Sequence, residues 1–168
     1  MRPKVIKIVI DSKLEEVPSV GRKVREICSS MRLPSFEAFL IELCVVEAVT
    51  NSIKHAYRLE AGHQVEITLS IVSDEFICDI CDAGIPMDSK LLEEKSPSLS
   101  VDADNLESIS EKGRGLAIIK EIMDNVTYTS KQGKNCLSMR KKLDLKSVVD
   151  TGNFKFHSIH QRLGTGDK

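Results

Sequence analysis

The chain contains few aromatic residues and no long hydrophobic run. Only 4% of its 168 residues are aromatic, and tryptophan is absent. The core must therefore consist mainly of isoleucine, valine and leucine, and few rings are present on which nucleic-acid bases could stack. No apolar stretch approaches the roughly 18 residues of a membrane-spanning helix, and the N-terminus lacks an apolar segment of signal-peptide length. These absences predict a cytoplasmic protein.

A strong net charge is also missing. The 24 basic and 25 acidic residues give a formal net charge of −1, which provides no overall attraction to DNA or to anionic lipid. Hydrophobic residues make up 41% and charged residues 29% of the chain, as in ordinary globular proteins. A chain of this length buries about 70% of its unfolded surface and needs no disulfide or metal to fold. We therefore expect one main domain that contacts neither nucleic acid nor a membrane.

The five cysteines are an odd number, which predicts reduced thiols and not a disulfide framework. Cys78 and Cys81 form a CxxC pair, but residues 75–81 have the pattern of a strand. Side chains three residues apart on a strand point to opposite faces, so these two cannot turn toward one metal ion. We expect thiols in the core or at the surface. The alternative interpretation is a metal or redox site.

Hydrophobic periodicity predicts strands that are mostly joined in tight pairs, with helices between the pairs. Such pairs favour a largely antiparallel sheet with the helices on one face. The expected fold is therefore α+β, a two-layer α/β sandwich, with the apolar segment 39–49 buried at its centre. The expected strands are 4–10, 64–72, 75–81, 125–130 and 136–143, and the expected helices are 17–31, 36–57 and 115–123.

Residues 88–112 form the most polar interior stretch, rich in acidic residues and serine. They predict a long mobile loop, and long loops in compact domains are usually functional lids or disordered segments. Residues 144–168 lack clear periodicity and are expected to form a loosely attached tail. The domain should therefore span residues 1–143.

Glu47, Asn51 and His55 recur every four residues in the second expected helix. This spacing places them on one helix face. Carboxylate and carboxamide oxygens there could hold Mg²⁺ or a water bound to it. An ordinary solvated helix face has the same spacing, so both interpretations remain open.

Two further polar clusters flank the polar stretch. Asp82 and Gly84 directly follow a hydrophobic strand, where they form either a simple turn or a carboxylate presented to a ligand beside an open backbone. Residues 112–116, Lys-Gly-Arg-Gly-Leu, end the polar stretch and open a helix. The glycines there serve either as a hinge or cap, or they expose backbone N–H groups to an anion that the helix dipole also favours.

Together the three clusters resemble, in type and order, the GHKL ATPase/kinase superfamily, in the variant of the bacterial anti-sigma-factor serine/threonine-protein kinases. Residues 47–57, Glu-Ala-Val-Thr-Asn-Ser-Ile-Lys-His-Ala-Tyr, resemble its N-box. Residues 82–88, Asp-Ala-Gly-Ile-Pro-Met-Asp, resemble its DxGxG-like box with proline in place of the second glycine. Residues 113–119, Gly-Arg-Gly-Leu-Ala-Ile-Ile, resemble the glycine box after the ATP lid. The similarity covers about residues 5–143 and implies a Bergerat-type sandwich with ATP under a lid at 88–112.

The resemblance also implies roles for single residues. Glu47 would be the general base, Asn51 would coordinate the Mg²⁺ that bridges the phosphates, and Asp82 would accept a hydrogen bond from the adenine amino group. Lys54 could reach a phosphate or be solvated, and His55 could orient the N-box or have a structural role. The residues implied to bind the nucleotide are Asn51, Lys54, His55, Asp82, Gly84, Ile85, Met87, Gly113, Arg114, Gly115 and Leu116.

One segment departs from the family pattern. Members often carry threonine near adenine at the start of the final strand. Here residues 134–138 read Lys-Asn-Cys-Leu-Ser, so the corresponding contact is not supplied by threonine.

The function implied by the resemblance is that of an ATP-dependent serine protein kinase that is also an anti-sigma factor. Such a protein, expected as a homodimer, sequesters a sigma factor and phosphorylates a serine of a small anti-anti-sigma protein. Two alternatives remain open. The chain could be a nucleotide-gated module that binds partners without phosphotransfer, or an α/β interaction protein that binds no nucleotide.

Overall fold

Five strands form one open sheet in the structure, a computed structural model that describes residues 4–93 and 111–143. All neighbouring strands pair antiparallel in the order β1-β2-β3-β5-β4. The predicted α+β fold with an antiparallel sheet is therefore confirmed. The strands are β1 (Lys4–Asp11), β2 (Gln64–Val72), β3 (Glu75–Asp82), β4 (Asn125–Lys131) and β5 (Lys134–Lys142).

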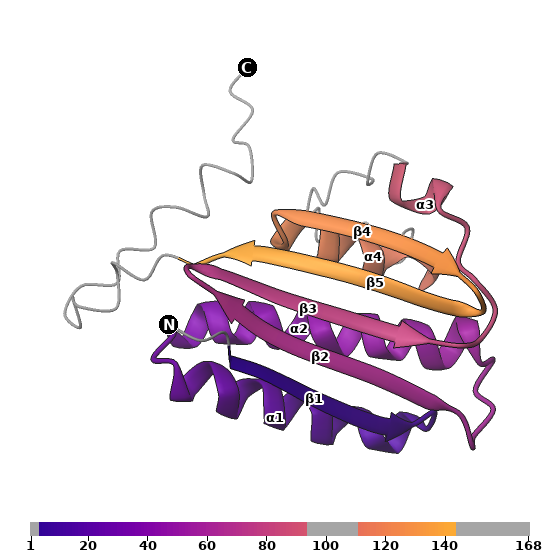
Figure 1. Ribbon diagram of the computed structural model, residues 1–168, viewed down its shortest axis with the longest axis horizontal. Helices are drawn as coiled ribbons and strands as arrows, with labels where there is room; N and C mark the ends of the chain where they lie inside the picture. The colour runs from indigo at the N-terminus through magenta and orange to yellow at the C-terminus, as the bar shows by residue number, and fades with distance from the viewer. Residues whose placement is uncertain (1–3, 94–110, 144–168) are drawn as a thin grey trace, which may run out of the picture.

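Three helices cover one face of this sheet and leave the other face without a helix among the described residues (Figure 1). They are α1 (Val17–Ser30), α2 (Ser35–Asn51) and α4 (Glu111–Ile122). Strand residues alternate between the two faces, as the buried Val65, Ile67 and Leu69 of β2 show. The core thus lies between the helices and the inner face of the sheet. The shorter helical segments are η1 (Leu14–Glu16), η2 (Ser52–Ala56) and α3 (Lys90–Glu93).

The central helix α2 is buried along one side only. Ile41, Cys44 and Val45 are fully buried, as the apolar sequence predicts. Phe39, however, is 52% exposed, so the expectation of burial over all of 39–49 is wrong at its start. The reason is the two-layer arrangement. A helix in such a fold contacts the sheet and the adjacent helices, and its remaining side faces solvent.

The second expected helix changes its winding before it ends. It is α-helical to Asn51 and continues as the π-helix η2, where Tyr57 N–H donates to the Ser52 carbonyl at 3.1 Å. A π-helix has a wider turn than an α-helix. The four-residue spacing that places Glu47 and Asn51 on one face therefore does not extend to His55, whose side chain is exposed.

The expected lid and tail fall largely outside the described residues. Within 88–112 the structure describes α3 and the start of α4, which begins at Glu111, before the helix start expected at residue 115. Residues 94–110 and the tail 144–168 lie outside the described part. The expected domain boundary at residue 143 coincides with the end of the described part and stays a prediction.

The expectation that the cysteines are all reduced is wrong for two of them. Cys81 and Cys136 form a disulfide, whereas Cys28, Cys44 and Cys78 are free and buried. The strand register places Cys81 directly opposite Cys136 on one face, and no local pattern reveals a pairing across 55 residues. The expected divergence of the CxxC pair is confirmed, because Cys78 lies in the core and Cys81 on the helix-free face.

Residues 4–93 and 111–143 contain no group of three or more His, Cys, Asp or Glu side chains arranged to hold a metal ion. No helix in the same part of the chain is long and apolar enough to cross a membrane.

Candidate functional site

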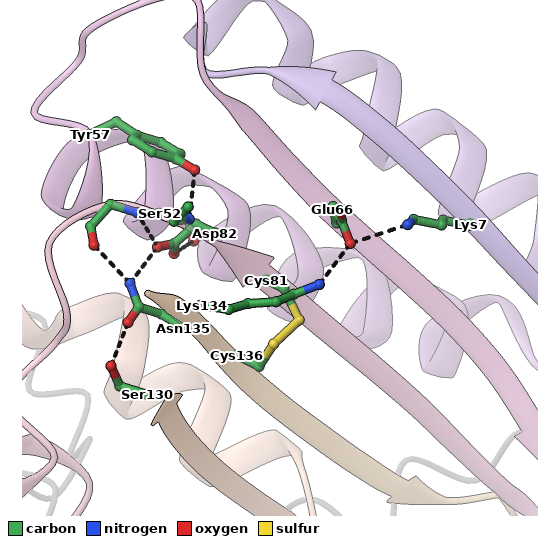
Figure 2. The surroundings of a disulfide bond; sticks show 12 residues. Lys7, Ser52, Tyr57, Glu66, Cys81, Asp82, Ser130, Lys134, Asn135 and Cys136 are labelled. Atoms are coloured by element: carbon green, nitrogen blue, oxygen red, sulfur yellow. Dashed lines mark hydrogen bonds and ion pairs between the residues drawn. A yellow bond between two sulfur atoms is a disulfide. The ribbon is translucent and has the colours of Figure 1, made fainter. Parts of the chain in front are cut away.

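Asp82, the last residue of β3, is held by three hydrogen-bond donors (Figure 2). Its Oδ1 accepts from Asn135 Nδ2 at 2.8 Å and from Gly84 N–H at 3.1 Å. Its Oδ2 accepts from Ser52 Oγ at 2.9 Å. A carboxylate has about four acceptor positions, so this side chain has a fixed orientation and room for one more donor. It is suited to an amino group of a ligand and unsuited to a carbonyl.

Asn135 is the main site residue that the sequence analysis missed. It is 3% exposed, and its amide also donates to the Gly84 carbonyl at 3.0 Å. Its Oδ1 accepts from Ser130 Oγ at 2.7 Å. The residue lies in the segment 134–138 that corresponds to the threonine-bearing segment of the family pattern, and it secures both Asp82 and the following turn. Only the pairing of Asp82 with Asn135 across β3 and β5 reveals this role, because the two are far apart in sequence.

The turn after Asp82 is fixed to the rest of the fold through its backbone. Ile85 N–H donates to the Ala56 carbonyl at 2.9 Å, and Met87 N–H donates to the Tyr128 hydroxyl at 2.8 Å. A Cβ at Gly84 would strike the Ala56 carbonyl oxygen, so glycine is required for this close approach. The structure therefore brings Gly84, Ile85 and Met87 together in one ordered turn beside Asp82, with the Ile85 side chain about half exposed.

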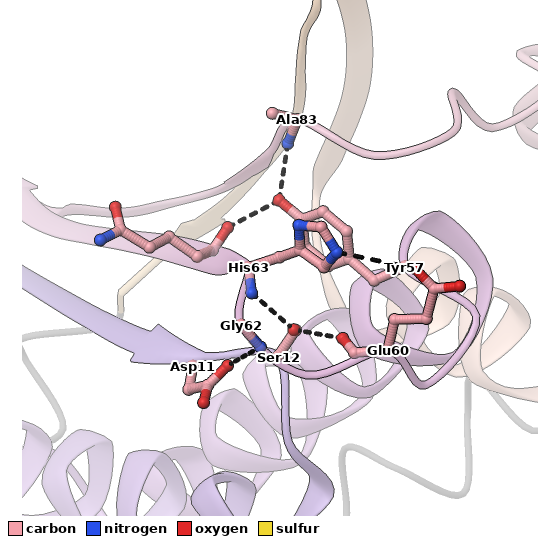
Figure 3. A network of polar contacts seen from close by, with 8 residues as sticks. Asp11, Ser12, Tyr57, Glu60, Gly62, His63 and Ala83 are labelled. Carbon is pink, nitrogen blue, oxygen red and sulfur yellow. Dashed lines mark hydrogen bonds and ion pairs between the residues drawn. The ribbon is translucent and has the colours of Figure 1, made fainter.

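Tyr57 connects the end of η2 to this turn and to β2 (Figure 3). Its hydroxyl donates to the Gln64 carbonyl at 2.7 Å and accepts from Ala83 N–H at 2.8 Å. Burial raises the pKa of Tyr57, which keeps the hydroxyl protonated and able to donate at neutral pH. Its ring stacks on His63 with the ring centres 4.7 Å apart. Tyr57 thus supports the site through these contacts, although the sequence analysis assigned this residue no role.

The loop between Tyr57 and β2 is in turn anchored to the end of β1 (Figure 3). The Ser12 hydroxyl donates to the Glu60 carbonyl and accepts from His63 N–H, while Gly62 N–H donates to the Asp11 carboxylate at 2.7 Å. The segment carrying Tyr57 is therefore held at both ends.

Glu47 and Asn51 face the first turns of α4. A Cβ at Gly115 would strike Glu47 Oε2 and lie 3.4 Å from Asn51 Nδ2. Glycine at this position therefore lets α4 approach these two half-buried side chains without displacing the Glu47 carboxylate. Gly113 and Arg114 lie in the first turn of α4, whose N–H groups have no acceptor within the helix. Gly115 and Leu116 follow at the start of the second turn.

Lys54 and His55 lie on η2 with exposed side chains. The structure brings neither into the hydrogen-bonded group around Asp82. Their contact with a nucleotide stays a prediction.

The site thus has two chemically different ends along one helical segment. Ser52 reaches the Asp82 carboxylate, whereas Glu47 and Asn51 lie next to the positive end of α4. A ligand with an amino-bearing base at one end and phosphates at the other fits this arrangement. The oxygens of Asn51 and Glu47 also suit Mg²⁺, which in proteins usually takes one or two side-chain ligands and completes its shell with phosphate and water.

Comparisons with known proteins show the family to which the chain belongs. Residues 10–141 match the family model of the histidine kinase-like ATPase domain. The serine-protein kinase RsbW of Bacillus cereus (strain ZK / E33L) is 24% identical over 148 residues, which cover 88% of this chain and 91% of the relative. The serine-protein kinase RsbW of Staphylococcus aureus (strain bovine RF122 / ET3-1) is 31% identical over 112 residues, covering 66% of this chain and 69% of the relative.

Two solved structures share the fold at low sequence identity. The crystal structure of the RsbU and RsbW domains of a Mycobacterium tuberculosis protein has a TM-score of 0.59 at 13% identity, covering 83% of this chain and 32% of that one. The SiaB–SiaC complex from Pseudomonas aeruginosa gives 0.54 at 12% identity, covering 80% of this chain and 88% of the matched one. The chain belongs to the histidine kinase-like ATPase family, in the group of the bacterial anti-sigma-factor serine kinases.

Proposed function

We propose that this chain is an ATP-dependent serine protein kinase that also acts as an anti-sigma factor. Its substrate would be a serine of a small anti-anti-sigma protein, and its second partner a sigma factor. The observation that carries the proposal is the placement of Glu47 against Gly115 near the start of α4. The helical segment that carries Glu47 continues to Ser52, whose hydroxyl helps to position Asp82. Relatives named serine-protein kinase support the kinase activity.

The surroundings of Asp82 support recognition of adenine in this proposal. Asp82 has an acceptor position left for the exocyclic amino group of the base, while Ser52 and Asn135 prevent the carboxylate from turning away. Guanine presents a carbonyl oxygen at the equivalent position, and two acceptors facing each other repel. The site therefore favours ATP over GTP.

The other end of the site would hold the phosphates and the reacting hydroxyl. Backbone N–H groups in the first turn of α4 and the Arg114 side chain supply positive charge to the phosphates. Asn51 would hold Mg²⁺, which neutralises charge that develops on the phosphate oxygens. Glu47 lies one helical turn before Asn51, and in this proposal it accepts the proton of the attacking serine hydroxyl.

The partner assignments rest on the relatives and on the family resemblance. The RsbW relatives are named serine-protein kinases, and the SiaB fold neighbour is found in a complex with SiaC. These names support phosphorylation of a protein partner, whereas sequestration of a sigma factor and a homodimer as the working form are proposed from the family resemblance alone.

Replacing Glu47 with glutamine tests the kinase proposal. Calorimetry with Mg²⁺ and ATP should give an unchanged affinity for Glu47→Gln, because the residue lies at the phosphate end and Asp82 is untouched. Transfer of labelled phosphate to a candidate anti-anti-sigma protein should fall by about 100-fold or more, in the range usual for loss of a general base.

A matched control is Glu42→Gln on the same helix, whose carboxylate pairs with Arg25 and lies outside the site. It should keep both ATP binding and transfer. If Glu47→Gln binds ATP and transfers phosphate normally, Glu47 is not the base. If the wild-type chain binds ATP but phosphorylates no partner, the alternative of a nucleotide-gated binding module replaces the kinase.

A further inference from the structure

The five cysteines divide into two chemically distinct groups. Cys28, Cys44 and Cys78 are buried and free. Burial raises the pKa of Cys28 to about 11 and that of Cys44 to about 12, and it raises the pKa of Cys78 well above its usual range. Because the thiolate is the reactive form, these three do not take part in exchange at neutral pH. Any redox chemistry of the folded chain is therefore left to Cys81 and Cys136.

The disulfide of these two lies beside the residues that fix the candidate nucleotide site (Figure 2). Cys81 pairs with Cys136 at the register position directly before the pair of Asp82 and Asn135. The two pairs point to opposite faces of the sheet, since consecutive strand residues alternate. The crosslink thus ties β3 to β5 at the end of their ladder, where a strand pair otherwise frays most easily.

The crosslink also closes a loop that carries much of the site. Cys81 and Cys136 are 55 residues apart, and the chain between them contains the turn 82–87 and the α4 segment with Gly113 and Gly115. The bond joins the two ends of this loop, which the ladder between β3 and β5 also pairs. A change at the bond therefore acts on the adenine end directly and on the phosphate end through the enclosed chain.

A reagent can reach the bond from the helix-free face. Both cysteines are only half-buried, and none of the described helices covers that face (Figure 1). Cys81 also lines a cavity of about 240 Å³ together with Tyr57, Asp82 and Lys134. Cys81 and Cys136 are thus partly exposed in the folded protein, unlike the three core cysteines.

We propose that Cys81 and Cys136 form a thiol–disulfide exchange site that tightens the nucleotide site when it is oxidised. The reactant is a dithiol. One of its thiolates attacks the Sγ of one cysteine and releases the other as a thiolate. Its second thiol, as the thiolate, then attacks the mixed disulfide and releases the first cysteine. The dithiol leaves as a disulfide, having given two electrons and two protons to the protein. Oxidation by a disulfide reverses both steps.

The expected effect on the affinity for ATP rests on the proposed function, whereas the thiol–disulfide exchange at Cys81 and Cys136 does not. Without the bond, β3 and β5 remain paired through their ladder but separate more often at Asp82 and Asn135. The expected rise in the Kd for ATP is about 3-fold to 10-fold, as for the loss of one modest hydrogen bond.

The experiment uses dithiothreitol on the folded, oxidised chain without denaturant. Thiol labelling and peptide mass spectrometry should find new thiols at Cys81 and Cys136. Calorimetry should give the weaker Kd for the reduced form and the original Kd after reoxidation. Cys81→Ser/Cys136→Ser should match the reduced wild type in every redox condition, and the single variant Cys28→Ala should retain the full response to dithiothreitol.

Several results would overturn the proposal. A bond that resists reduction in the folded chain excludes the exchange site, and equal affinities of the two forms exclude its link to the nucleotide. If neither the oxidised nor the reduced form binds ATP, the proposed function fails on its own. Amide hydrogen exchange then tests whether the disulfide still controls the order of the turn after Asp82. The amides of Ala83 and Gly84 must exchange faster after reduction, and unchanged rates reject the proposal. If the double variant does not fold, the reduced wild type provides the same comparison.

Discussion

Asp82 has few acceptor positions left to offer, and under the proposed function this selects the ligand that it binds. Three donors within the protein occupy most of its capacity and fix its orientation. What remains is one acceptor position with a set direction. A residue prepared in this way loses little freedom when a ligand binds, so its hydrogen bond contributes more to affinity.

Replacing Asp82 with asparagine should therefore weaken ATP binding. The substitution removes a charge-assisted hydrogen bond and turns part of the acceptor surface into a donor, at a cost of about 1.5–3 kcal/mol, or roughly 10-fold to 150-fold in Kd. Calorimetry with Mg²⁺ and ATP gives the measurement. The control is Asp79→Asn, on the same strand but on the opposite face, which should leave the Kd unchanged. An Asp82→Asn variant of normal affinity would exclude the adenine contact.

At this scale the sequence predicted the residues that stand in recognisable motifs and missed their supports. Asp82 and Glu47 follow from spacing and order, because a motif is a local pattern. Asn135 does not, because its role depends on the register between strands distant in sequence. Ser52, next to Asn51, was equally hidden, since a serine in a helix has no reason to be noticed until its partner carboxylate is located.

Among the elements, α2 and α4 set the phosphate end of the site through one close contact. Glycine at position 115 leaves just enough room for the Glu47 carboxylate, which lies where any side chain at 115 would begin. The obstacle is the end of a flexible side chain and not backbone. A larger residue at 115 should therefore displace Glu47 and leave the helices packed.

The variant Gly115→Ala should separate stability from activity. Alanine is favoured over glycine within a helix by about 1 kcal/mol, so thermal stability should be equal or higher. Phosphate transfer should fall, because Glu47, the proposed base, would be displaced from its position beside the start of α4. Thermal unfolding and labelled-phosphate transfer measure the two effects. Gly21→Ala is a matched control, since its Cβ would approach the Glu42 carboxylate on α2 outside the site. It should retain transfer, and a Gly115→Ala enzyme with full activity would contradict the assignment.

The elements themselves were largely predictable, and their irregularities were not. Alternating and helical periodicity predicted all five strands and the three long helices to within a few residues. The switch to a π-helix at Ser52 has no counterpart in the pattern of apolar residues, because both windings bury Ile53 and Ala56. The exposure of Phe39 depends on how many layers lie above α2, and local periodicity does not contain that information.

Across the whole molecule, one carboxylate links strands from the edge to the middle of the sheet. Glu66 on β2 contacts Lys7 on the edge strand β1 at 3.2 Å and Lys134 on β5 at 3.0 Å. The hydrogen bond from Lys134, followed by that from Lys7, holds the pKa of Glu66 below its ordinary value of 4.5. The folded state thus binds this proton more weakly than the unfolded state does.

The sign of the pH effect follows from this difference. The contribution of Glu66 to the free energy of unfolding is present above about pH 4.5. It is lost as the pH falls through the lowered pKa of Glu66 in the folded state. Urea unfolding should show Glu66→Gln to be less stable than wild type at pH 7, by at most about 1 kcal/mol for exposed pairs. The difference should shrink toward pH 3. Glu26→Gln, an exposed residue of α1, controls for the loss of a surface carboxylate. A difference that stays constant with pH would exclude this linkage.

The pairing of β3 with β5 has a consequence for the folding of the protein during its synthesis on the ribosome. Asp82 belongs to one hairpin and Asn135 to another, and the two residues are 53 positions apart. A nascent chain that has emerged only as far as β4 already contains Glu47, Asn51 and Gly115 but has no partner for the end of β3. Closing such a long segment is costly until the strand contacts form. The hydrogen bond of Asn135 to Asp82 therefore forms only once the last strand of the sheet has been made, and under the proposed function a chain that ends before β5 would not bind ATP normally.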